Sequence, residues 1–152
     1  MAQAVQEVKG AVWWEGSLMR IKGAESTGGA LGLVDAIFYE GFGPPLHLHH
    51  GEDEGFYVLE GAIRFRRGDE DFVAGPGSLV WMPRGVPHAF KAEPGGARAL
   101  LLFVPGGFER MFAEGGVPLS ESPDPPTNEY DPETVIALAD RFKLEVVGPQ
   151  LA

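Results

Sequence analysis

The 152-residue chain contains no cysteine. This absence excludes disulfide bonds, zinc–thiolate sites and nucleophilic thiols. Long apolar runs are absent as well, because the longest, residues 99–105, is far shorter than the roughly 18 residues that a membrane span needs. No basic stretch followed by an apolar stretch is visible near the first residue, so no secretory signal is recognised. We therefore expect a cytoplasmic protein without a membrane partner.

Basic residues are few relative to acidic ones. The chain has 12 lysines and arginines against 22 aspartates and glutamates, which gives a formal net charge of −10. A protein that binds nucleic acid needs a cationic surface against the phosphates. We therefore expect no nucleic-acid partner, and we expect most of the carboxylates to lie on a solvated surface.

Glycine and proline are abundant, with 22 and 13 residues respectively. They separate short apolar segments that recur about every ten residues, a pattern typical of all-β proteins. The predicted strands are 13–22, 31–40, 46–49, 56–59, 62–67, 71–74, 78–82, 88–92 and 98–104. The segments on either side of Glu60-Gly61 are expected to form a hairpin, and no helix is expected among the strands.

The pattern changes after the last predicted strand. Apolar residues at spacings of three and four predict a short helix over residues 107–114. Asp131 and Pro132 suit the N-cap and first position of a second helix, which runs to Phe142. We expect a single domain. Its predicted parts are a barrel core at about 11–105 and a helical and irregular extension at 106–152, within one domain at 1–152.

Several predicted strands are apolar on both faces. Leu100 and Leu102 alternate with Leu101 and Phe103, for example. A strand in an isolated barrel needs only one apolar face, so the second face requires cover from terminal segments or from another subunit. We expect a homodimer.

Three of the four histidines lie between residues 41 and 61. His47 and His49 alternate on a strand, so they project from one face about 6.5–7 Å apart and can bind one ion. Glu54 follows a turn and can reach back to the same point, although Glu52 and Asp53 in that turn could compete with it. His50 alternates off the ligand face.

The fourth histidine, His88, follows a proline- and glycine-rich turn and must reach the site from another part of the barrel. Three imidazoles and one carboxylate suit a divalent first-row transition metal ion: Fe, Mn, Ni, Co, Cu or Zn. We therefore predict one such ion, bound by His47, His49, Glu54 and His88. Four protein ligands on an octahedral ion leave two adjacent positions for inner-sphere chemistry. Because these ligands must be unprotonated, occupancy should fall as the pH drops through about 6–6.5.

The spacing of these residues resembles a known family. The first segment reads Gly41-x5-His47-x-His49-x4-Glu54-x6-Gly61 and is similar to the first cupin motif at every fixed position. The second reads Gly77-x5-Pro83-x-Gly85-x2-His88 and is similar to the second cupin motif, except that Ala92 stands where that motif has asparagine. The extension resembles small single-domain cupins of the quercetin-dioxygenase-like group. The resemblance implies a double-stranded β-helix, or jelly-roll barrel, and a metal site at the four ligands.

The leading functional hypothesis is a metal-dependent dioxygenase that acts on a small aromatic or enol substrate. This is what the resemblance to the quercetin-dioxygenase-like group implies. Glu54 would be a metal ligand and also the base that takes the substrate proton. Phe56 and Phe90 share faces with ligands and could line the pocket or simply fill the core, and the first predicted helix could cover the barrel mouth. Two alternatives stay open: a redox-neutral isomerase or lyase that uses the ion as a Lewis acid, and a non-enzymatic cupin that binds a small molecule.

Overall fold

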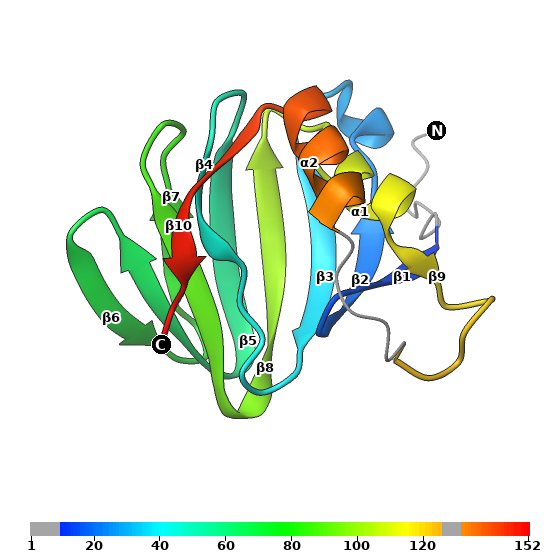
Figure 1. Ribbon diagram of the computed structural model, residues 1–152. Coiled ribbons are helices and arrows are strands. Elements are labelled where there is room, and N and C mark those ends of the chain that lie inside the picture. The colour runs from blue at the N-terminus through cyan, green and yellow to red at the C-terminus, as the bar shows by residue number, and fades with distance from the viewer. Residues whose placement is uncertain (1–9, 126–131) are drawn as a thin grey trace.

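The computed structural model describes residues 10–125 and 132–152. Strands dominate it, and the two α-helices both lie in the last third of the chain (Figure 1). In chain order the elements are β1 (Ala11–Trp14), β2 (Ser17–Lys22), the 3-10 turn η1 (Glu25–Thr27), β3 (Gly32–Phe38), β4 (Pro45–His49), β5 (Asp53–Arg67), β6 (Glu70–Ala74), β7 (Leu79–Met82), β8 (His88–Val104), α1 (Arg110–Gly115), β9 (Val117–Pro118), α2 (Pro132–Arg141) and β10 (Leu144–Gln150).

The strands form one antiparallel sheet that curls into a barrel. The hydrogen-bonded order is β10-β4-β8-β3-β2-β1-β9, and β5 pairs with β6, β7 and β8. Side chains that alternate inward from these strands fill the interior, with Phe38, Phe56, Phe65 and Phe103 almost completely buried. The predicted all-β jelly-roll barrel with a short C-terminal helical tail is therefore confirmed.

The predicted hairpin around Glu60-Gly61 is wrong. Residues 53–67 form one strand, β5, which pairs along its length with β8 and shifts register on either side of Gly61. Gly61 has a φ of 73°, and a Cβ there would collide with the carbonyl oxygen of Gly96 in β8. The glycine thus marks a bulge in a continuous strand, where close backbone approach excludes any side chain.

Two other strand boundaries differ for similar local reasons. The predicted strand 13–22 is a hairpin, β1 and β2, that turns at Glu15 and Gly16, where Glu15 has a φ of 53°. The predicted strands 88–92 and 98–104 are parts of the single strand β8, which continues through Ala92. Gly61, Gly95 and Gly96, which the sequence suggests as strand ends, therefore lie within the continuous strands β5 and β8.

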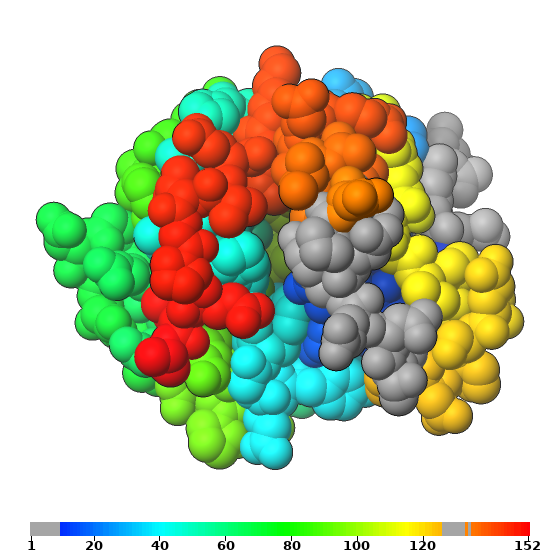
Figure 2. Space-filling view, viewed as in Figure 1, coloured from blue at the N-terminus to red at the C-terminus, as the bar shows by residue number. Residues whose placement is uncertain are grey.

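The extension packs against the barrel as well as following it. Both predicted helices are present as α1 and α2, although the predicted N-cap Asp131 lies outside the described residues. Beyond α2 the chain returns as β10, which pairs antiparallel with β4 and places Leu144 opposite His49 and Val146 opposite His47. In Figure 1, β10 lies across the front of the molecule, and α1 and α2 lie together at one end of the sheet. Figure 2 shows this C-terminal segment, in orange and red, covering much of the same face.

Within the described residues, none of the helices has the length and apolar character needed to cross a membrane.

Candidate metal centre

The structure brings the four predicted ligands together from three strands. His47 and His49 lie on β4, Glu54 lies near the start of β5, and His88 opens β8 directly opposite His47. Each offers one donor atom, and these four atoms all lie within 4.8 Å of one another. All four side chains are buried. The arrangement follows from strand alternation and from the pairing of β8 with both β4 and β5.

His49 provides the test of whether a metal ion fits. Both of its ring nitrogens are buried and have no hydrogen-bond partner among the described residues. Its Nε2 lies 3.0 Å from Glu54 Oε2, but the geometry is not that of a hydrogen bond. Buried polar atoms are rarely left without a partner, because the loss costs about 1–3 kcal/mol. A cation among the four donor atoms would take the lone pair that Nε2 has once its proton is lost, so the residues fit a metal ion.

The other two imidazoles are oriented by backbone carbonyl groups. His47 Nδ1 lies 2.7 Å from the carbonyl oxygen of Pro45, and His88 Nδ1 lies 3.2 Å from that of Val86. A carbonyl oxygen only accepts, so each Nδ1 donates its N–H, and each ring is thereby turned so that its Nε2 points into the cluster. His88 Nε2 is 3.1 Å from Glu54 Oε2. This is the orientation that ligating histidines adopt in metal proteins.

Burial and neighbouring charges separate the protonation states of the cluster. Burial, and then the charges of His88 and His49, lower the pKa of His47 to about 3. Burial also disfavours the charged form of His49, but its contacts with Glu52 and Glu54 outweigh this and raise the pKa of His49 to about 9. Burial raises the pKa of Glu54, yet the close contacts with His49 and His88 and their charge outweigh it and hold that pKa well below its usual range. Glu54 is therefore an anion, and a metal ion must displace the proton of His49.

A cavity of about 70 Å³ opens beside His47, His49 and Glu54. The remaining described lining residues are mostly apolar and come from both the barrel and the extension. From the barrel they are Trp14, Glu15, Met19, Phe42, Pro44, Pro45, Phe90 and Leu101, and from the extension Phe108, Met111, Phe112, Val135, Leu144 and Val146. Such a wall suits an apolar or aromatic ligand next to the ion.

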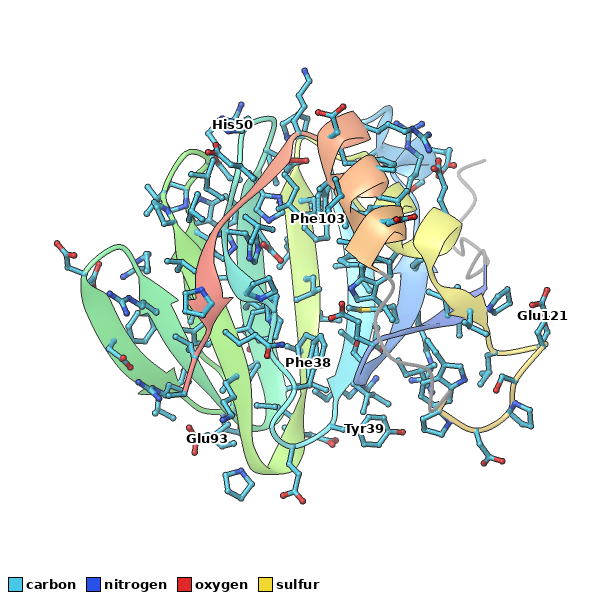
Figure 3. All side chains as sticks on the ribbon, in the orientation of Figure 1. Phe38, Tyr39, His50, Glu93, Phe103 and Glu121 are labelled. Atoms are coloured by element: carbon cyan, nitrogen blue, oxygen red, sulfur yellow. The ribbon has the colours of Figure 1, made fainter. Side chains whose placement is uncertain are left out.

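The sequence leaves open whether Phe56 and Phe90 line the pocket or fill the core, and the structure answers this for each of them. Phe90 lines the cavity, whereas Phe56 is fully buried and is not among the described lining residues. The first helix contributes to the cavity too, and the ring of Phe108 meets the ring of His49 edge-on at 4.4 Å between centroids. His50, as expected, lies off the ligand face, where its Nε2 pairs with Glu145 at 2.7 Å (Figure 3).

Two further acidic groups lie near the site, and the sequence does not indicate Glu15 at all. Glu15, in the β1–β2 turn, lines the cavity; its surface is exposed to solvent, but burial of its carboxyl group raises its pKa to about 7. Glu52 is buried, and its Oε2 lies 3.5 Å from His49 Nδ1, on the side of the ring away from Glu54. No local pattern marks Glu15, whereas the sequence suggests Glu52 only as a competing ligand.

Comparison with known proteins agrees with this geometry. A family model described as the cupin domain matches residues 36–105, a segment that contains all four ligands. This match agrees with the two motifs, which resemble those of cupins. Over 130 residues it is 26% identical to quercetin 2,3-dioxygenase of Bacillus subtilis (strain 168), covering 82% of this chain and 38% of that enzyme. The chain thus spans less than half the length of this curated relative.

Solved structures share the fold. A variant of oxalate decarboxylase OxdC from Bacillus subtilis is 24% identical with a TM-score of 0.57, covering 85% of this chain and 42% of that one. The polyketide cyclase RemF from Streptomyces resistomycificus is 24% identical with a TM-score of 0.56, over 68% and 80% of the two chains. KdgF from Halomonas sp. is 24% identical with a TM-score of 0.55, over 61% and 84%. At these identities the likeness concerns the fold alone.

Proposed function

We propose that this protein is a metal-dependent dioxygenase that acts on a small aromatic or enol substrate. The observation that carries the proposal is the buried, unpartnered Nε2 of His49, which lies with three further donor atoms at the wall of an apolar cavity. Oxygen chemistry is supported by the similarity to quercetin 2,3-dioxygenase. The ion is expected to be Fe, Mn, Ni, Co, Cu or Zn, because the donors are three nitrogens and one oxygen.

The ion, when bound, would supply a Lewis-acid centre with positions open to a substrate oxygen. The chain's own residues then orient and protect that centre. His47 and His88 keep their Nε2 atoms directed to the cluster through hydrogen bonds from Nδ1 to backbone carbonyl oxygens. This fixed orientation lowers the reorganisation that ligand binding requires.

Glu54 is positioned to act as the base. It lies on the cavity wall and is an anion, so a hydroxyl group of an enol or phenol can donate its proton to a Glu54 oxygen. Protonated His49 depresses the pKa of Glu54.

The cavity wall excludes water and favours planar substrates. Phe42, Phe90 and Phe108 present aromatic rings to the same space, and Trp14 and Phe112 lie beside them. Aromatic faces pack well against flat rings, with pairs contributing about 0.5–1.5 kcal/mol beyond the area they bury. The wall thus selects for an aromatic or conjugated ligand.

The test begins with the metal content of the purified protein. Protein loaded separately with Fe, Mn, Ni or Co should consume oxygen with at least one member of a flavonol and diketone panel. His49→Ala and Glu54→Ala should lose metal and oxygen uptake together. His50→Ala, which alters a neighbouring histidine that is not a ligand, should keep both. A wild-type protein that stays metal-free after reconstitution would remove the basis of the proposal.

A second candidate is a redox-neutral isomerase or lyase. It is favoured by the same carboxylate and imidazole cluster, since proton abstraction by Glu54 next to a Lewis acid needs no oxygen. Two of the proteins with similar folds are described as a polyketide cyclase and an oxalate decarboxylase, which supports considering a reaction other than dioxygenation. Turnover that continues under strict anaerobic conditions, with no oxygen uptake in air, would favour this candidate. Ligand-induced thermal stabilisation without turnover in any metal form would instead favour a non-enzymatic binding protein.

We also propose that two copies of the chain pair through the outer face of the sheet at β5 and β7. Tyr57 and Leu79 are opposite each other on this face and are 40% and 62% exposed. Trp81 packs over Gly55, where a Cβ would collide with the indole ring. Exposed apolar patches of this kind mark interaction surfaces. Leu79→Glu should convert a dimer to a monomer in sedimentation experiments, and a monomeric wild type would contradict the proposal.

A further inference from the structure

Glu52 lies in the turn between β4 and β5, and the ligand set does not account for it. Its side chain is 8% exposed, and its Oε2 has no hydrogen-bond partner among the described residues. Within residues 10–125 and 132–152, no lysine or arginine forms an ion pair with it. A buried carboxylate without a compensating cation is strongly unfavourable, so its position requires a partner.

His49 is the partner that the geometry offers. Its Nδ1 lies 3.5 Å from Glu52 Oε2, and this nitrogen also has no hydrogen-bond partner among the described residues. The two atoms need to approach by only about 0.6 Å to reach the usual N–H···O distance. The opposite ring nitrogen, Nε2, faces Glu54 at 3.0 Å. The imidazole therefore lies between two carboxylates, one within the ligand cluster and one behind it.

Comparison of the three imidazoles shows what is distinctive about His49. In His47 and His88 the Nδ1 atom faces a backbone carbonyl oxygen two residues earlier in the chain. In His49 the same ring position faces a carboxylate instead. Glu52 thus occupies, for this ligand, the place that a neutral backbone acceptor occupies for the other two. A charged acceptor forms a stronger hydrogen bond than a neutral one.

We propose that Glu52 is a positioning residue that accepts the Nδ1–H of His49, directs Nε2 toward the ion and makes His49 the most electron-donating of the three imidazole ligands. The inference rests on the metal-binding part of the proposed function and is independent of the reaction. Glu52 stays outside the coordination sphere, because the four donor atoms gather without it. Loss of such an acidic partner behind a ligating histidine weakens metal affinity by roughly 10- to 100-fold.

The experiment is a titration of the metal-free, full-length protein with Co²⁺ alone, followed by visible absorption of the bound ion. Glu52→Ala should weaken Co²⁺ affinity by roughly 10- to 100-fold. Glu52→Gln, which keeps the shape but removes the charge, should also weaken it and should shift the absorption bands of Co²⁺. Glu145→Gln is the matched control, because Glu145 is an exposed carboxylate that faces His50, a histidine outside the ligand set. It should leave both affinity and spectrum unchanged.

Three outcomes would overturn the inference. Unchanged affinity and spectrum in both Glu52 variants would show that the carboxylate does not act on His49. A loss as large as that of His49→Ala, with fewer ligands to Co²⁺, would make Glu52 a ligand itself. A wild type that binds no Co²⁺ would remove the metal site and the proposed function together, which distinguishes that failure from the first two. If Glu52→Ala does not fold, the isosteric Glu52→Gln variant decides the question.

Discussion

The segment that matches the cupin domain, residues 36–105, and the extension, residues 106–152, contribute different parts of the site. All four candidate ligands lie in the first segment. Within its described residues, the extension contributes no ligand but supplies about a third of the cavity wall: Phe108, Met111, Phe112, Val135, Leu144 and Val146. The two regions meet where β10 pairs with β4, the strand that carries His47 and His49. The candidate ligands therefore lie in one region, whereas the cavity wall is shared by both.

The barrel and the extension also differ in how deeply their side chains are buried. The barrel interior is made of side chains that are almost completely buried, such as Phe56, Phe65 and Phe103. The extension packs on this core with fewer buried apolar side chains, which are Phe108, Met111, Phe112, Leu138 and Ala139, and it keeps Ile136 and Val147 exposed. We therefore expect changes in the barrel to affect folding and metal binding, and changes in the extension to affect mainly the organic ligand.

The largest effect is expected on stability. Phe65→Ala removes a fully buried ring from the barrel core and should lower the free energy of unfolding by about 3–5 kcal/mol. Leu138→Ala removes a buried side chain from the extension and should cost less, about 2 kcal/mol, because the loosely attached helix can settle into the space. Urea unfolding of both variants measures the difference. Equal losses would show that the extension is as integral to the fold as the barrel.

The next effect concerns metal affinity. His88→Ala should weaken it by more than about 100-fold, which exceeds the loss expected for any residue outside the coordination sphere. Phe108→Ala removes the ring that meets His49 edge-on. It should change the affinity less than about tenfold, since no ligand is lost. Calorimetric titration with Mn²⁺ or Co²⁺ measures the metal affinity of both variants. A loss of affinity in Phe108→Ala as large as that in His88→Ala would contradict the expectation that the extension has little effect on metal binding.

The pH dependence of metal binding provides a third prediction. Protonated His49 competes with the ion, and its pKa of about 9 keeps it protonated at neutral pH before metal binds. Between about pH 6.5 and 9 the apparent affinity should therefore rise about tenfold per pH unit, with about one proton released per ion. His47, with a pKa of about 3, contributes nothing in this range. Titrations in buffers of different ionisation enthalpy count the protons, and no release at pH 7.5 would contradict the prediction.

The same proton affects the stability of the metal-free protein. Because the pKa of His49 is raised above its ordinary value of 6.5, its contribution to stability is complete below pH 6.5. That contribution should be lost as the pH rises through about 9. His49→Ala should remove this loss in thermal unfolding measured across the range, whereas His50→Ala should retain it.

Part of the site follows from local sequence pattern. Alternation places His47 and His49 on one strand face, and a short turn returns Glu54 to the same point, so the sequence alone is enough to group these three residues. Grouping them with His88 requires the resemblance of residues 41–61 and 77–88 to the two cupin motifs. The structure brings all four donor atoms together. That they bind a metal ion stays a prediction.

Other features could not be predicted because they depend on distant parts of the chain. Gly61 lies within a continuous strand only because β8 runs beside it, and the local sequence cannot distinguish a bulge from a turn. The segment 144–150 contains glycine and proline and shows no strand pattern, yet it becomes β10 because β4 leaves an edge to pair with. The burial of Glu52 likewise depends on how the β4–β5 turn folds back over His49.

The smallest effect tests the extension as a wall for the organic ligand, and α2 contains a matched pair of residues. Val135 lines the cavity, whereas Ile136, the next residue, is 68% exposed. Val135→Ala removes two methyl groups from the wall and should raise KM for an aromatic substrate by about fivefold, which corresponds to about 1 kcal/mol of lost apolar contact. The value of kcat and the metal affinity should stay unchanged, because the contact is made equally before and during reaction. Ile136→Ala should change none of these quantities. If Val135→Ala lowers kcat or metal affinity as much as it raises KM, α2 supports the ligand cluster itself, and the two regions do not act separately.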